Sequence, residues 1–285
     1  MVVKMSNDVY KKFKNMIESS EYKNEEELEE HIHNFLIDEM LQNNNVENAN
    51  LIKAYKLVDK ATQEKDEEKA IKYAKEAYEL CPECIEALMV LENYEESAFK
   101  KLEMLDEILA FEKKRLQKIN KYYKTNEDAY EEKEMYIISL FQKISLLIYL
   151  GRINIAKETC EEYLKIDSED SFGVHTTLMA IYAYFEDEKN LLKLYKKYPE
   201  ENLETIFPLF VLYFKQGNDL QATKYFNILN EINNNFSKYF LDTLDLDENE
   251  PNEEEIEILL FMEAYSFLVE STGGIRLFVE EKTKK

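Results

Sequence analysis

Residues 51–82, LIKAYKLVDKATQEKDEEKAIKYAKEAYELCP, decide the fold that we expect for this chain. The pattern predicts two short helices joined by a turn, with Asp66 as the N-cap of the second helix. The small residues Ala70 and Ala77 would let that helix approach its neighbour closely. Pro82 would end it, because proline cannot continue a helix. The stretch therefore predicts a helical hairpin.

The same spacing returns further along the chain. Gly151 and Ala156 lie five residues apart, as do Gly217 and Ala222, and each pair places a turn glycine before a small residue of a second helix. Stacked hairpins would bury a continuous core that no single hairpin can bury alone. The pattern predicts repeat units at 51–84, 137–170, 171–202 (a degenerate unit, with Asn190 at the alanine position and Pro199 ending its second helix) and 203–236, with a longer unit at 85–136.

The repeat resembles a known family. With Leu51 as position one, Ala70, Ala77 and Pro82 fall at positions 20, 27 and 32, which resembles the 34-residue tetratricopeptide repeat. Ala54 departs from the family, which has an aromatic residue there. The order of segments resembles one bacterial tetratricopeptide family whose members are mostly uncharacterised, and residues 51–170 more weakly resemble the suppressor-of-tumorigenicity-seven proteins. The resemblance implies a right-handed α-α superhelix, a tetratricopeptide solenoid, that contacts other proteins and carries no catalytic residues.

The N-terminal part and the insertion follow their own patterns. Residues 1–50 are expected to form a small helical cap, in which 42–50 (QNNNVENAN) is a linker. Within the 85–136 unit, unbroken apolar spacing predicts one long helix from Leu102 to Tyr123, and 124–128 is the expected loop.

The C-terminal part, 237–285, is expected to cap the other end of the stack. An acidic loop at 242–255 precedes a long helix that Asn252 would cap and that would run to about Val269, before a last short packed segment. Upstream of this part, Pro208 falls inside the first helix of the 203–236 unit, so that helix either kinks there or begins nearby.

Composition limits the classes of function. The chain has 285 residues and a net charge of −23, with only 5 Gly and 4 Pro, which favours an almost entirely helical protein. A field of this sign repels phosphate backbones and anionic lipids, so neither nucleic acid nor a membrane is an expected partner. Three cysteines and a lysine-rich surface suit the reducing cytoplasm.

Three patterns could suggest metal or redox chemistry, and in each we favour a structural interpretation. The CxxC at Cys81 and Cys84 lacks a second ligand pair and brackets the turn proline. Glu30 and His33 form half of a di-iron signature whose other half is missing. The segment from Asp245 begins like an EF-hand loop but has no glycine at the turn. We therefore expect no metal, no cofactor and no enzymatic activity.

The first helices of the repeats supply the candidate binding site. In such a solenoid they would line a concave face, and aromatic residues with Met could bind an amphipathic helix. The chain's own leader or C-terminal helix is an equally good occupant of this groove. The candidate groove residues are Tyr55, Phe141, Ile148, His175, Met179, Tyr182, Val211 and Phe214.

These observations predict a non-enzymatic adaptor that holds a peptide or helix of another protein. The acidic surroundings would select basic flanks, so affinity should weaken with salt. One alternative is a regulator that senses a small molecule or peptide, and another is a self-assembling structural protein.

Overall fold

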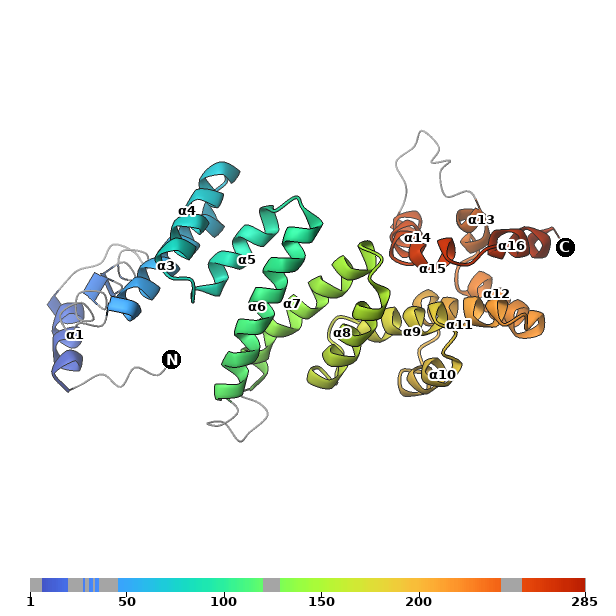
Figure 1. Ribbon diagram of the computed structural model, residues 1–285, viewed down its shortest axis with the longest axis horizontal. Coiled ribbons are helices and arrows are strands. Elements are labelled where there is room, and N and C mark those ends of the chain that lie inside the picture. The colour runs from blue at the N-terminus through green and yellow to red at the C-terminus, as the bar shows by residue number, and fades with distance from the viewer. Residues whose placement is uncertain are drawn as a thin grey trace. The chain divides into compact units, whose positions relative to one another are not determined.

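The computed structural model describes residues 7–19, 28, 31–32, 34–35, 46–119, 129–241 and 253–284. Over these residues the chain is all α-helical, none of them lies in a strand, and successive helices within a unit, such as α3 with α4 and α11 with α12, pack against each other (Figure 1). The chain divides into two compact units, Met1–Gln117 and Lys118–Lys285. The boundary falls inside the long 85–136 segment, so each unit is described by itself.

The first unit begins with a leader helix, as expected, and continues with packed helices. Its described helices are α1 (Asn7–Ser19), α3 (Val46–Gln63), α4 (Glu67–Leu80), α5 (Ile85–Tyr94) and α6 (Ala98–Ile119). The expected linker at 42–50 is wrong over its second half, because α3 begins at Val46. The predicted long helix is confirmed as α6 up to Ile119, whereas the loop expected at 124–128 lies outside the described residues.

The hairpin predicted at 51–82 is confirmed. The Asp66 carboxylate accepts a hydrogen bond from the Lys69 backbone N–H at 3.1 Å, which caps α4. Ala70 and Ala77 are fully buried, and α4 ends at Leu80, two residues before Pro82.

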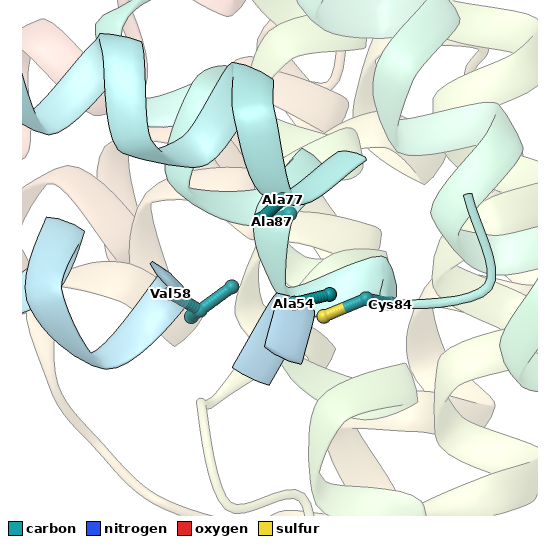
Figure 2. Packing of buried hydrophobic residues seen from close by; sticks show 5 residues of the cluster. All are labelled: Ala54, Val58, Ala77, Cys84 and Ala87. Carbon is teal, nitrogen blue, oxygen red and sulfur yellow. The ribbon is translucent and has the colours of Figure 1, made fainter. Parts of the chain in front are cut away.

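Small side chains hold the next helix against this hairpin. Figure 2 shows Ala54 and Val58 of α3, Ala77 of α4, and Cys84 and Ala87 at the start of α5 forming one buried cluster. A larger residue at the fully buried Ala54 would force these helices apart, because protein interiors are close-packed. The small side chain of Ala54 therefore suits the packing of α3 against α4 and α5.

The second unit repeats the hairpin arrangement and ends in short helices. Its helices are α7 (Ala129–Tyr149), α8 (Ile153–Ile166), α9 (Val174–Tyr184), α10 (Glu188–Lys197), α11 (Leu203–Lys215), α12 (Asp219–Ile232), α13 (Phe236–Leu241), α14 (Glu253–Ala264), α15 (Ser266–Glu270) and α16 (Ile275–Thr283). Helix α11 begins at Leu203, where Asn202 and Thr205 form a capping box, and passes through Pro208.

The C-terminal cap differs from the expectation in one respect. The single helix expected up to Val269 is wrong, because it is divided at Tyr265 into α14 and α15. The buried Tyr265 ring packs on Phe207 of α11, at 5.9 Å between centroids, and on Phe261 at 4.8 Å. The last short segment is confirmed as α16, while the Asn252 cap and the residues of the acidic loop before it lie outside the described part.

Three turns of the second unit share one geometry. Gly151, Gly217 and Glu186 each lie two residues after the end of a first helix, with φ of +67°, +68° and +57°. In each turn the following residue donates its N–H back into the helix, for example Asp187 to the Tyr182 carbonyl at 2.8 Å. This is the Schellman arrangement, which favours glycine at the left-handed position. Glu186 occupies that position in the unit that the sequence shows as degenerate.

We expect Glu186→Gly to raise the free energy of unfolding of the second unit by about 0.5–1 kcal/mol, because it removes left-handed strain. The 3.7 Å ion pair of Glu186 with Lys215 would be lost, but Glu186 is half exposed, so that pair contributes little. Gly217→Ala is the matched control and should lower stability by about 1 kcal/mol. Urea denaturation of both variants measures the effect, and a destabilised Glu186→Gly would contradict this account.

No helix in the part of the chain that the structure describes combines the length and apolar character needed to cross a membrane.

Candidate functional site

The second unit contains a groove of about 960 Å³ between α7 and the C-terminal helices. Phe141, Ser145 and Ile148, spaced four and then three residues apart, form its wall on α7. Leu260 on α14 and Phe267 on α15 lie on the opposite side. Segments far apart in the sequence therefore build one apolar site.

Large apolar side chains are exposed at this groove. Tyr149 is 80% exposed and Leu260 is 60% exposed, although both are large enough to stabilise a protein core. Phe267 contacts Tyr184 of α9, with 6.2 Å between ring centroids, and so fixes α15 against the groove floor. Exposed apolar residues gathered at a concave site are typical of binding surfaces.

The charged residues that line the groove are acidic. Glu263 of α14 and Glu270 of α15 lie on the surface beside the apolar residues. Among the described residues that line this groove, there is no Lys or Arg. The local charge is therefore negative, as is the charge of the whole chain.

The structure places the predicted groove residues in four environments. Phe141 and Ile148 line the groove, whereas Tyr55 lies in the first unit, where its hydroxyl donates to Glu86 at 3.4 Å. A further set is buried in the second unit: His175, Met179, Tyr182 and Val211.

Phe214 belongs to the fourth environment, beneath the C-terminal helices. Its ring lies 5.3 Å from that of Phe278 on α16, between centroids. Nearby on α11, Phe207 packs against Phe261 of α14 at 5.4 Å, and Phe210 against Phe278 at 5.8 Å. The chain's own C-terminal helices therefore cover this face of α11, which is one of the two occupants that the sequence left open.

The loop between α8 and α9 is held by buried hydrogen bonds. Asp170, at φ +58°, accepts hydrogen bonds from the Val174 N–H at 2.7 Å and from the His175 N–H at 2.9 Å. The same carboxylate lies 2.6 Å from Nδ1 of His175. The His175 ring stacks on Tyr198 at 4.3 Å. These contacts explain why His175 points into the protein rather than into the groove.

The loop also positions an aromatic ring against Phe141, a residue that lines the groove. Phe172 stacks on Phe141 with 4.9 Å between ring centroids. The Phe172 N–H donates to the Tyr163 hydroxyl at 3.2 Å, and that hydroxyl donates to Asp167 at 2.9 Å. The buried polar groups of the loop therefore fix one side of the apolar site.

Asp167 gives this loop a pH dependence. Burial raises the pKa of its carboxyl, but hydrogen bonds from the Ser171 N–H, the Tyr163 hydroxyl and neighbouring groups outweigh burial and lower the pKa below its usual value. A lowered pKa means that the carboxylate stabilises the fold above the unfolded value of about 3.9. That contribution is lost as the pH falls through the folded pKa.

We therefore expect wild-type stability to fall more steeply than that of Asp167→Asn as the pH falls below about 4, because only the wild-type residue takes up this proton on unfolding. Urea denaturation of both proteins at several pH values measures the difference in their free energies of unfolding. The contributions of the other carboxylates are the same in both proteins and cancel in this difference. Parallel stability curves over this range would contradict the assigned role of Asp167.

The cysteines of the CxxC pattern lie in a packed environment. Cys84 is fully buried, and burial together with the nearby Glu86 raises the pKa of its thiol to about 12. A reactive thiolate needs the opposite shift. Among the described residues, no three His, Cys, Asp or Glu side chains are placed to hold a metal ion. Glu30, His33 and the segment from Asp245 to Asn249 lie outside the described residues.

Comparison with protein-family models finds no match, and a search of curated proteins finds no similar sequence. The resemblance to the tetratricopeptide families therefore stays a prediction from the repeat pattern.

Sequence reasoning missed the residues that face Phe141 and Ile148 across the groove. Leu260, Glu263 and Phe267 come from a helix that was expected only as a cap. Tyr149 follows Ile148 directly and lies at the end of the apolar α7, but repeat positions alone do not distinguish an exposed residue from a buried one.

Proposed function

We propose that this chain is a non-enzymatic cytoplasmic adaptor, built as a right-handed tetratricopeptide-like solenoid, that binds a segment of another protein. Consecutive hairpins support the solenoid, and so do the contacts between first helices of neighbouring hairpins, α3 with α5 and α9 with α11. This pattern of neighbour contacts is typical of repeat stacks. The C-terminal helices α13–α16 cover α11, the first helix of the last hairpin, as a capping segment does.

The groove in the second unit carries the proposal. It exposes Tyr149 and Leu260 over an apolar site, and an adaptor would recover the cost of that exposure by burying them against a partner. Two side chains that could act in catalysis, Asp170 and His175, have structural roles instead. The buried Asp170 carboxylate holds the loop and pairs with His175. This arrangement favours binding over catalysis.

The test is site-specific photo-cross-linking in the cells that express the protein. A photoreactive phenylalanine at Tyr149 or at Leu260 should cross-link the same partner protein. The same group at Leu220, which is 80% exposed on α12, is the control and should not. Equal cross-linking from Leu220, or none from the groove, would overturn the proposal.

The cross-linked species also separates the alternatives. A second copy of this chain attached at Tyr149 would favour the self-assembling protein. Thermal stabilisation of the purified chain by a small molecule, with no protein captured, would favour the sensor, because a ligand that binds only the folded state raises its stability.

A further inference from the structure

We infer that the occupant of this groove is a short amphipathic α-helix with a basic edge. This inference rests on the proposed function and specifies the partner's chemistry. Three observations support it: the spacing of the apolar residues on α7, the hydrogen bonds of the groove hydroxyls, and the positions of Glu263 and Glu270.

The groove has the length of two helical turns. Its α7 wall runs from Phe141 to Tyr149, which spans about 12 Å at the helical rise of about 1.5 Å per residue. Ser145 lies half-way along this wall, and its small side chain leaves room for a partner side chain between the larger Phe141 and Ile148. A partner helix would place apolar residues at i, i+4 and i+7 along this distance, facing Leu260 on the other side.

The hydrogen-bonding groups of the groove favour a helix over an extended peptide. The Ser145 hydroxyl donates to the Phe141 carbonyl at 3.4 Å, and the Ser271 hydroxyl donates to the Leu268 carbonyl at 3.0 Å. Among the described lining residues there is also no Asn or Gln to bind a peptide backbone. The other hydroxyls of the lining, such as those of Thr177 and Ser266, are too few to pair every backbone group of an extended peptide, whereas a helix satisfies its own.

The charges specify one edge of the partner. Glu263 and Glu270 lie seven residues apart on the C-terminal side of the groove, and both are exposed. Lysine or arginine on the partner helix, beside its apolar face, would pair with them. An acidic helix would meet repulsion both from these two residues and from the net charge of −23.

The experiment measures fluorescence anisotropy of labelled peptides with the purified full-length chain. The probe is a 16-residue peptide of Leu, Ala and Lys with leucine at helical spacing. Two controls are the same composition with the leucine pattern scrambled, and the same pattern with Glu in place of Lys. We expect the probe to bind at least tenfold more tightly than either control.

Variants of the chain test whether the probe binds in the groove. Glu263→Lys with Glu270→Lys should weaken probe binding at least tenfold. The matched control, Glu158→Lys with Glu231→Lys, makes the same change of net charge at exposed positions on α8 and α12 and should weaken it less than threefold. Leu260→Asn should also weaken binding, and its side chain is exposed enough for the fold to tolerate the change.

Equal binding of the probe and the scrambled peptide would overturn the inference, and so would equal effects of the two charge-reversed pairs. A partner that cross-links to Tyr149 through an extended or acidic segment would also overturn it, while leaving the proposed function in place. Failure of both the cross-linking and the peptide binding would overturn the proposed function as well as the inference about the partner helix.

Discussion

Asp170→Ala is expected to lower the free energy of unfolding of the second unit by about 2–5 kcal/mol, because each buried donor that loses its acceptor costs about 1–3 kcal/mol. The Asp170 carboxylate is buried and accepts from two backbone N–H groups of α9 while it contacts His175. Alanine would leave these donors inside the protein without a partner. It would also occupy a left-handed position, at φ +58°, which disfavours it.

Two variants give this prediction its controls. Asp66→Ala removes an N-cap on the exposed side of α4 and should cost only about 1 kcal/mol. Asp170→Asn keeps one acceptor oxygen and should lie between wild type and Asp170→Ala. Thermal and urea denaturation measure all three, and an Asp170→Ala effect no larger than that of Asp66→Ala would contradict the role of the buried carboxylate.

The same variant tests the connection between the loop and the groove. Asp170 lies in the middle of the loop that holds Phe172 against Phe141, and Phe141 lines the groove. Under conditions where Asp170→Ala is still folded, we expect weaker binding of a groove ligand, because the Phe141 ring loses its stacked neighbour.

The sequence was sufficient for the helical class and for the local hairpins. Ala70, Ala77 and Pro82 act within one hairpin, and Gly151 and Gly217 set the backbone of their own turns, so local rules apply to them. Glu186 shows the limit of such rules, because it occupies the left-handed position of a turn where glycine is the recognisable signal.

The candidate site was harder to predict because its parts are distant in the sequence. Nothing near Phe141 indicates that Leu260 lies across the groove, since that contact depends on the packing of α14 and α15 in the second unit. His175 has the spacing of a groove residue, but a carboxylate five residues earlier determines where its ring lies. Helical spacing identifies a face of a helix, whereas long-range packing determines what covers that face.

Phe207→Ala is expected to lower the free energy of unfolding of the second unit by about 3–5 kcal/mol, the usual range for removing a buried phenylalanine. Its side chain is fully buried at the centre of an aromatic cluster. The ring centroid lies within 5.4 to 6.2 Å of those of Phe210, Phe236, Phe240, Phe261 and Tyr265. The five neighbours come from α11, α13 and the α14–α15 segment, so one ring joins the C-terminal helices to the repeat helices.

The loss should therefore be greatest where α14 and α15 pack. Hydrogen exchange of residues 253–284 should accelerate more than that of α7 and α8, and binding of a groove ligand should weaken at least tenfold, because Leu260 and Phe267 form the second wall. Phe207→Leu, which keeps most of the apolar volume, should cost about 1–1.5 kcal/mol and preserve binding. Unchanged exchange of 253–284 in Phe207→Ala would show that contacts other than this ring hold the wall in place, since α14 also packs on α13 and α15 on α9.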